Sequence, residues 1–349
     1  MEKLDIKSMS LDELKQQMKE LGLPAFRAGQ VYSWLHCFYV DDFEQMTNLS
    51  KDLRAKLAER YYINSLSIKR KLVSAIDGTV KYLYELKDGN CVEAVLMKYK
   101  HGSSLCISTQ VGCKMGCKFC ASTLAGWVRN LTPSEMLDEI YYAVKDSGQR
   151  VDSLVLMGIG EPLDNFDNVT KFLELLRSPE GYNLSLRHVT LSTCGLVERI
   201  YDLADKDYQL TLAVSLHAPN NEMRSRTMPV NDRYAIEKLI QACRDYFKKT
   251  GRRITFEYAL IAGVNDSIQA AEELSTLLKG LPCHINLIPV NEVKERGLKR
   301  SGAQAIRDFQ NTLGKLGLNA TIRRELGSDI SAACGQLRRE EGMRREEKQ

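Results

Sequence analysis

The sequence lacks a long hydrophobic run and an apolar leader. No stretch of about 18 consecutive apolar residues, the length that a membrane-spanning helix needs, occurs among its 349 residues. The chain begins MEKLDIKSMSLDELK, which is polar and charged and unlike a secretory signal. We therefore expect a cytoplasmic protein with no membrane partner.

The sequence also lacks a strong net charge, but its basic residues are unevenly distributed. The whole chain carries +4. Between Leu66 and Thr132, ten lysines and arginines stand against four acids, a local excess of six positive charges. A solvated surface and a nucleic-acid interface explain this excess equally well.

Ten cysteines are present, although nothing else suggests a secreted disulfide protein. In a reducing compartment, clustered cysteines more often bind metal or react. Five of them have no surrounding motif, and we expect these to be structural: Cys37, Cys91, Cys194, Cys243 and Cys283.

The hydrophobic pattern changes twice along the chain. Residues 1–65 show helical periodicity, with Ser10–Glu13 as a capping box. Residues 66–103 alternate with a period of two between turn signals, which predicts a small antiparallel β extension. Residues 104–337 alternate between strand and helix patterns, and residues 338–349 form a charged tail that we expect to fray.

The strand–helix alternation predicts a parallel sheet curved into an incomplete barrel of six βα units. A seventh short strand fits residues 319–324. The six expected strands cover residues 104–109, 152–157, 187–192, 209–216, 253–259 and 283–289.

Three cysteines follow the first of these strands with CxxxCxxC spacing: Cys113, Cys117 and Cys120. In α/β barrels the loops after the strands form the active site. A structural zinc ion needs four protein ligands, and the chain lacks a second CxxC pair. Three thiolates can instead hold three irons of a four-iron cubane and leave the fourth iron open.

An aromatic residue, Phe119, precedes the third cysteine. This spacing resembles the signature of the radical S-adenosylmethionine (SAM) enzymes. In that superfamily the open iron binds the amino and carboxylate groups of SAM, and an electron from the cluster cleaves SAM to a 5′-deoxyadenosyl radical.

Small polar residues follow the later strands, where a barrel places its ligand. In the segment GIGEP, Gly160 allows close approach of the backbone and the Glu161 carboxylate can receive an ammonium group. Alone, such a segment is more often an ordinary turn. The other strand ends carry Ser192, Ser215, Leu216, His217 and Asn291.

Longer segments resemble one family. They are CISTQVGCKMGCKFCASTLAG, MGIGEPLDN, VSLHAPN, RSRTMPVN, HINLIPVN and DISAACGQL. They are similar to the bacterial RNA adenine-C2 methyltransferases of the radical SAM superfamily, which act on 23S rRNA and tRNA and are related to C8-methylating resistance enzymes. The expected fold is α/β: a partial (βα)6 radical SAM barrel with an N-terminal helical accessory domain and the β extension.

The resemblance implies a reaction that uses one 4Fe-4S cluster and two SAM molecules per turnover. One SAM methylates a cysteine, and the radical from the other removes hydrogen from that S-methyl group. The resulting methylene radical adds to C2 of adenine, which is too electron-poor to attack SAM itself. Loss of the C2 proton and attack by a second cysteine release the product and leave a disulfide.

The resemblance also implies roles for matching residues. Cys334 would carry the methyl group, Cys106 would resolve the intermediate, and Glu93 would accept the C2 proton. Cys113, Cys117 and Cys120 would bind the cluster. The contacts to SAM would be Gly160, Glu161, Ser192, Ser215, Leu216, His217 and Asn291.

These residues also have structural explanations. Cys106 lies in an apolar strand, where cysteines are often simply buried, and His217 suits a core position. Glu93 alternates with valines, so it faces either solvent or an interior where an unpaired carboxylate is costly. A transient Cys106–Cys334 disulfide needs Cα atoms about 4.4–6.8 Å apart in some state, so we expect the final segment to fold back over the barrel mouth.

The implied partners are 23S rRNA, tRNA and a reductant of the flavodoxin or ferredoxin type, and we expect a monomer. The target base would leave its stack. Candidate RNA contacts are Arg27, Lys69, Arg70, Lys71, Arg323, Arg324 and the loop 294–300. The segments GEPLDN and LIPVN favour C2 over C8 methylation. A non-catalytic iron–sulfur RNA-binding protein is the alternative of a different class, and it would need a fourth protein ligand.

Overall fold

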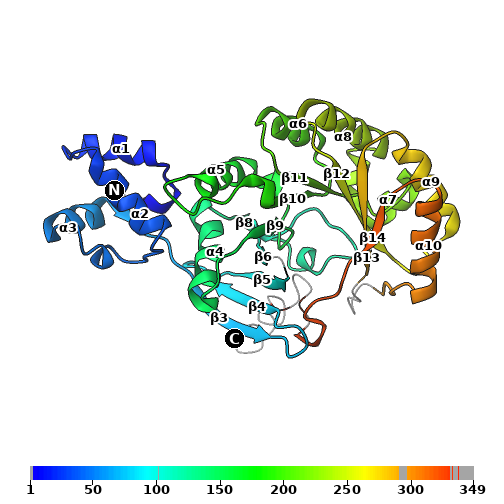
Figure 1. Cartoon of the computed structure of the whole chain (residues 1–349), viewed down its shortest axis with the longest axis horizontal. Coiled ribbons are helices and arrows are strands. Elements are labelled where there is room, and N and C mark those ends of the chain that lie inside the picture. Colours follow the sequence, from blue (N-terminus) through cyan, green and yellow to red (C-terminus); the bar gives the residue numbers. More distant parts are fainter. Residues whose placement is uncertain (1–2, 101, 291–296, 331, 333–336, 338–349) are drawn as a thin grey trace.

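The computed structural model describes residues 3–100, 102–290, 297–330, 332 and 337. Figure 1 shows a helical group at one end, antiparallel strands beside it, and a curved sheet covered by helices at the other end. Among the described residues, no helix has the length and apolar character to cross a membrane.

The N-terminal part is helical, as predicted. Helix α1 (Leu11–Glu20) begins with the expected capping box, in which the Ser10 side chain accepts from the Glu13 backbone and the Glu13 side chain accepts from the Ser10 backbone. Helices α2 (Phe26–His36) and α3 (Lys51–Arg60) follow. The short strands β1 (Leu4–Asp5) and β2 (Tyr61–Tyr62) pair in parallel and bring the two ends of this part together.

Ten strands form one continuous sheet, in the order β14-β13-β12-β11-β10-β9-β6-β5-β4-β3. The predicted antiparallel meander is confirmed: β3 (Ser67–Val73), β4 (Val80–Glu85) and β5 (Cys91–Tyr99) pair antiparallel, and β5 also pairs antiparallel with β6 (Gly102–Cys106). From β6 onward all pairs are parallel. The remaining strands are β9 (Ser153–Leu156), β10 (Val189–Thr193), β11 (Thr211–Ser215), β12 (Ile254–Leu260), β13 (Cys283–Pro289) and β14 (Ala320–Ile322).

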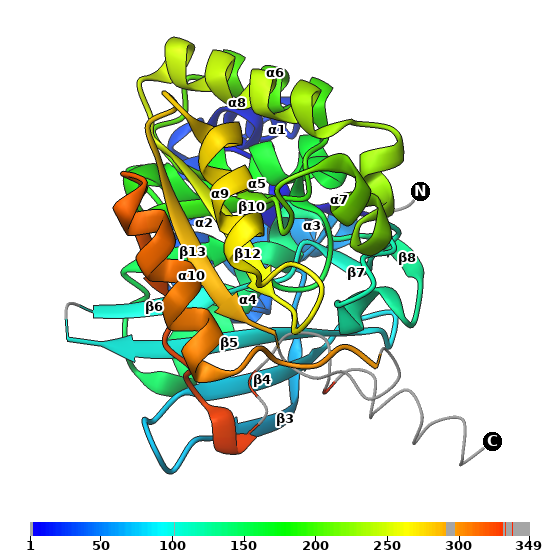
Figure 2. The ribbon, with the colours of Figure 1, turned by 90° about the vertical axis from the view of Figure 1, so that its right-hand side faces the viewer.

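Helices connect the parallel strands and cover the outer face of the sheet (Figure 2). Thr132 and Pro133 start the first of them with the predicted capping box. The helices are α4 (Pro133–Ser147), α5 (Phe166–Arg177), α6 (Val197–Asp205), α7 (Asn221–Thr227), α8 (Ile236–Thr250), α9 (Ile268–Leu278) and α10 (Ala303–Lys315). This arrangement confirms the predicted partial barrel, with β14 as the expected seventh strand.

Along each barrel strand, side chains point alternately to the hydrophobic core and to the inner face of the barrel. On β12, Phe256 and Tyr258 belong to the main hydrophobic core, whereas Glu257 and Ala259 line a cavity. Because successive side chains of a strand point to opposite faces, the apolar set faces the helices and the polar set faces the barrel interior.

The short strand pair on either side of the cysteine loop was not predicted. Strand β6 ends at Cys106, and a separate strand β7 (Gln110–Gly112) pairs antiparallel with β8 (Trp127–Asn130). The three clustered cysteines therefore follow β7 and not the first barrel strand directly. Gly112 has φ +81, and a Cβ there would lie 1.8 Å from the Gly126 carbonyl oxygen, so only glycine permits this pairing.

A buried ion pair ties the N-terminal part to helix α4. Lys7 Nζ lies 2.6 Å from Asp138 Oδ1, and the two side chains are 1% and 0% exposed. Lys7 also donates to the Asn64 carbonyl, and the Asn64 side chain donates to Asp138. Burial raises the pKa of Asp138 to about 6 although Lys7 opposes this shift.

We expect Lys7→Met to lower the free energy of unfolding by about 3–5 kcal/mol, because removal of one partner leaves a buried carboxylate uncompensated. Urea unfolding would measure the change. Lys15→Met is the matched control, since Lys15 pairs with Asp12 at the surface and surface pairs contribute little. Equal effects of the two substitutions would contradict the structural role of the Lys7 pair.

Candidate active site

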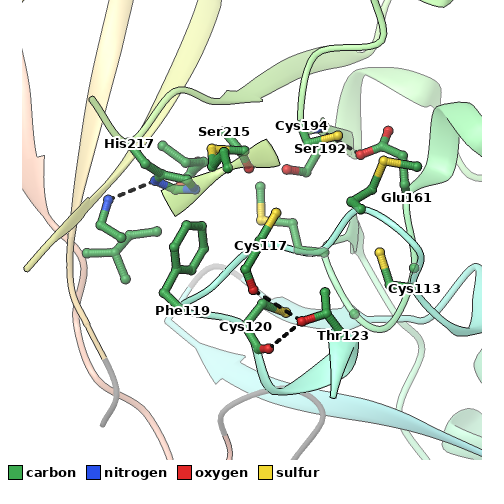
Figure 3. Close-up of a pocket in the computed structure, with 18 of the residues that line it drawn as sticks. Cys113, Cys117, Phe119, Cys120, Thr123, Glu161, Ser192, Cys194, Ser215 and His217 are labelled. Carbon is green, nitrogen blue, oxygen red and sulfur yellow. Dashed lines mark hydrogen bonds between the residues drawn. The ribbon is translucent and has the colours of Figure 1, made fainter. Parts of the chain in front are cut away.

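A cavity of about 260 Å³ opens at the carboxyl ends of the barrel strands. Figure 3 shows the three clustered cysteines on one side, with Ser192, Ser215 and His217 across from them. The structure thus brings together eight residues predicted from the sequence: Cys113, Cys117, Cys120, Gly160, Glu161, Ser192, Ser215 and His217.

One predicted cofactor residue within the described part of the chain does not line this cavity. Leu216 is fully buried in the hydrophobic core, and its backbone N–H donates to the Glu257 carbonyl. Asn291 lies outside the described residues.

Hydrogen bonds to backbone carbonyl groups hold the cysteine loop in place. The Thr123 hydroxyl donates to the carbonyls of Cys117 (3.1 Å) and Cys120 (3.0 Å), as Figure 3 shows. Cys113 N–H donates to the Gly126 carbonyl at 3.2 Å. These bonds hold the loop that places three cysteines on one cavity wall, although the described residues contain no group of three ligating side chains gathered into a ready-made metal site.

Burial disfavours the thiolate form of the cysteines on this wall when no cation lies beside them. It raises the pKa of Cys113 to about 12 and raises the pKa of Cys117 further. A cation or cluster at this wall would favour the thiolate form. The chemistry of this wall therefore suits bound iron.

Glu161 is oriented by backbone donors. Its Oε1 accepts from Leu163 N–H at 3.1 Å, and its Oε2 accepts from Cys194 N–H at 2.8 Å. Burial raises the pKa of Glu161, and these hydrogen bonds oppose the shift. The carboxyl group is therefore held in one orientation at the cavity wall.

The turn before Glu161 requires glycine. Gly160 has φ +112, and a Cβ there would lie 2.7 Å from Cβ of Gln110. The Gln110 side chain accepts from Glu161 N–H at 2.9 Å. Close packing against Gln110 thus sets the position of the Glu161 backbone.

His217 presents one ring N–H to the cavity. Its Nδ1 accepts from Ala259 N–H at 2.9 Å, so the proton of the neutral ring is on Nε2. Burial lowers the pKa of His217 to about 3. The ring meets Phe119 edge-on with centroids 4.7 Å apart.

The cavity contains an acid that was not predicted from the sequence. Glu257 is 4% exposed and accepts from the Asn286 side chain at 2.9 Å. A lone acid within the apolar strand ITFEYAL was the available signal. Arg323, predicted as an RNA contact, and Cys194, expected to be structural, also line the cavity.

Glu93 and Cys106 lie on one face of the sheet beside the cavity. Cys106 pairs in register with Val95, two residues from Glu93, and packs in a cluster with Met157, which lines the cavity. Glu93 is 2% exposed and forms an ion pair with Lys81 at 2.9 Å. Glu93 therefore faces the interior, where its charge is paired.

Cys334 lies outside the described residues, but its described neighbours lie near Cys106 and Glu93. Ala332 packs against the cluster that contains Cys106. Leu337 packs with Leu83, which is the register partner of Glu93. The chain on both sides of position 334 thus reaches the expected face of the sheet.

Three hydrogen bonds anchor this final segment to the β3–β4 turn (Figure 1). Asp329 accepts from the Ser74 hydroxyl at 2.7 Å and from Ala75 N–H at 2.9 Å. Gly327 N–H donates to Asp77 at 2.9 Å. These bonds join parts of the chain about 250 residues apart.

Comparisons with known proteins agree with the fold. The family model for the ribosomal RNA large subunit methyltransferase N-terminal domain matches residues 4–63, and the radical SAM superfamily model matches residues 107–274. A probable dual-specificity RNA methyltransferase RlmN of Lachnoclostridium phytofermentans is 56% identical over 97% of this chain and 95% of its own length.

Further relatives cover the chain almost completely. The probable dual-specificity RNA methyltransferase RlmN of Alkaliphilus oremlandii is 55% identical over 97% of this chain and 98% of its own length. The crystal structure of a radical SAM methyltransferase from Sphaerobacter thermophilus matches with a TM-score of 0.90 at 43% identity, over 95% of this chain and 98% of that one.

We expect Gly160→Ala to destabilise the protein by about 2–5 kcal/mol, the sum of overpacking against Gln110 and strain at positive φ. Gly280→Ala is the matched control, because Gly280 also has positive φ but a Cβ there would meet no atom within 4 Å. Its cost should be about 1–2 kcal/mol. Thermal unfolding would compare them, and equal losses would argue against tight packing at Gly160.

We expect Asp329→Ala to loosen the final segment, because two hydrogen bonds to the β3–β4 turn are lost. Hydrogen exchange followed by mass spectrometry should show faster exchange in residues 326–332, by roughly tenfold for about 1.4 kcal/mol of lost stabilisation. Asp12→Ala serves as a control for loss of an acid, since Asp12 is exposed on α1. Unchanged exchange at 326–332 in Asp329→Ala would show that these bonds do not anchor the segment.

Proposed function

Because the chain belongs to the RlmN family of radical SAM RNA methyltransferases, we propose that it forms 2-methyladenosine. The substrates would be an adenosine of 23S rRNA near the peptidyl transferase centre and the adenosine 3′ of the anticodon in tRNA. The observation that carries this proposal is the packing of Ala332 and Leu337, on either side of Cys334, against the sheet face that holds Cys106 and Glu93.

The family implies a 4Fe-4S cluster and SAM. Cys113, Cys117 and Cys120 would hold the cluster, which when bound supplies the electron that cleaves SAM to a 5′-deoxyadenosyl radical. Glu161 would accept from the SAM ammonium group. His217 would donate from Nε2, and Ser192, Ser215, Leu216 and Asn291 would complete the contacts.

The methyl group would reach the base through Cys334. This cysteine accepts a methyl from one SAM, and the radical from the second SAM removes a hydrogen atom from the S-methyl group. The methylene carbon would then bond to C2 of adenine, and one electron would pass from the adduct back to the oxidised cluster, which had given one electron to cleave SAM. Two SAM molecules are used in each turnover.

Glu93 and Cys106 would complete the reaction. The Glu93 carboxylate accepts the C2 proton, whose bonding electrons remain on the base. The Cys106 thiolate attacks the Cys334 sulfur, so the carbon–sulfur bond breaks and its electron pair goes to the methyl carbon, which takes up a proton. A Cys106–Cys334 disulfide remains and is reduced before the next turnover.

Several parts of the chain would serve substrate binding. Residues 1–65 and the basic extension 66–103 would contact RNA, and the extension would also supply Glu93. Residues 104–337 would form the radical SAM barrel and the segment that carries Cys334, and residues 338–349 a charged tail. A flavodoxin or ferredoxin would supply electrons. We propose that the protein acts as a monomer in the cytoplasm.

The position of Cys194 supports one competing hypothesis, which therefore needs a test. A non-catalytic iron–sulfur RNA-binding protein needs a fourth cluster ligand, and Cys194 lines the same cavity as the three clustered cysteines. Its N–H already orients Glu161. A change in the electron paramagnetic resonance spectrum of the reduced cluster on addition of SAM would support the open position and exclude a permanent fourth ligand.

We expect peptide mass analysis of anaerobically purified protein to find one methyl group on Cys334. In Cys106→Ala, RNA should remain covalently attached at Cys334, because no thiolate is available to release it. Cys243→Ala is a matched control, since Cys243 is buried in the core away from the cavity. Digestion of the RNA product should give 2-methyladenosine, whereas 8-methyladenosine would assign the C8 reaction.

An unmodified Cys334 after incubation with SAM and RNA, in protein with an intact cluster, would contradict the proposed chemistry. The radical SAM fold would stand in that case, but the route through a methylated cysteine would not.

A further inference from the structure

Lys81 and Glu93 form a fully buried ion pair next to the Cys106 wall. Their charged atoms are 2.9 Å apart, and the side chains are 1% and 2% exposed. Lys81 on β4 is the register partner of Val95, and Val95 is in turn the register partner of Cys106. Three adjacent strands therefore place the ammonium, the carboxylate and the thiol on one face of the sheet.

Stability does not explain this pair. Removal of two charges from water costs more than their attraction commonly returns, so a hydrophobic pair of similar volume would serve the fold as well or better. The neighbours on this face are Leu83, Val95 and Met97, which are apolar and buried. A hydrophobic pair would therefore have matched its surroundings.

Glu93 is buried, and the described groups that face it come from neighbouring strands and from the final segment. From β4 it faces Lys81, from its own strand Cys91, and from β6 Cys106. Strand β7, which packs against β5, brings Gln110 and no ionisable side chain. The described residues of the final segment at this face, Ala332 and Leu337, are apolar.

An isolated carboxylate in such a setting binds a proton, because burial disfavours its charged form. A nearby cation favours the charged form. A protonated Glu93 could not accept the C2 proton. Among the described residues, Lys81 is a cation placed directly beside the Glu93 carboxylate.

We propose that Lys81 is a positioning residue for the methyl transfer: its ammonium group keeps Glu93 as a carboxylate and directs it along the face that holds Cys106. This inference rests on the proposed function, which makes Glu93 the proton acceptor. The proton moves from C2–H to the Glu93 carboxylate, its bonding electrons stay on the base, and Lys81 remains an ammonium group throughout.

The test follows the covalent RNA–Cys334 adduct, whose release requires loss of the C2 proton. Its disappearance is measured on denaturing gels between about pH 6 and pH 9, the range over which a buried carboxylate can ionise. The variants are Lys81→Met, Lys81→Arg and Glu93→Gln. Lys248→Met is the matched control, since this surface lysine lies on α8. Cys334 methylation and iron content report the steps that precede proton transfer.

We expect Lys81→Met to slow adduct release about 100-fold or more near pH 7, within the range for loss of a general base. Release should recover toward pH 9, as the buried carboxylate ionises. Glu93→Gln should be slow at every pH, because its amide cannot accept the proton. Lys81→Arg should stay within a few-fold of wild type, and all variants should methylate Cys334 normally. If the Lys81→Met protein contains no iron, Lys81→Gln replaces it as the neutral variant, because glutamine retains a hydrogen-bond donor.

Three outcomes would overturn the role of Lys81. The first is adduct release at the wild-type rate in both neutral variants. The second is slow release that no change of pH relieves. The third is loss of both Cys334 methylation and adduct release, which would indicate that Lys81 has a structural role only. Absence of Cys334 methylation in the wild-type protein is a different result. It contradicts the proposed function itself, and the role of Lys81 falls with it.

Discussion

The backbone ladder between β5 and β6 is the interaction on which the rest of the site depends. It joins an antiparallel extension to a parallel barrel without a break, with Val95 opposite Cys106. Because side chains of adjacent paired residues point to the same face, the inner face of the barrel continues onto the extension. Glu93 and Lys81 therefore reach the neighbourhood of the cavity although neither belongs to a barrel strand.

The second constraint is the cost of polar burial around the cavity. Glu161 and His217 are both buried, and each is satisfied by backbone N–H groups from a neighbouring strand end or loop. This pattern holds the side chains in one orientation before a ligand arrives, since an unsatisfied buried polar group is costly. The same requirement explains why the turn at Gly160 admits no side chain: Gln110 occupies that space and holds the Glu161 backbone.

The third constraint is the attachment of the final segment to the β extension. Asp329 and Gly327 bind the β3–β4 turn, so the extension serves both as a carrier of Glu93 and as the anchor for the chain that leads to position 334. Such an anchor lowers the entropic cost of bringing together residues that are distant in the sequence, because most of the loop between them is already closed. Packing of Ala332 beside Cys106 is the local consequence.

The sequence by itself determined the helical start, the antiparallel extension and the alternation of barrel strands and helices, the capping of α1 and α4, and the three cysteines at one loop. These features depend on periodicity, local hydrogen bonding and spacing, which adjacent residues specify. Only the tertiary structure decided that Glu93 is paired with Lys81, that β7 and β8 separate the first strand from the cysteines, and that Glu257 and Cys194 share the cavity. Each of these depends on which strands become neighbours and in which register, because one residue of slip moves a side chain to the opposite face of a sheet.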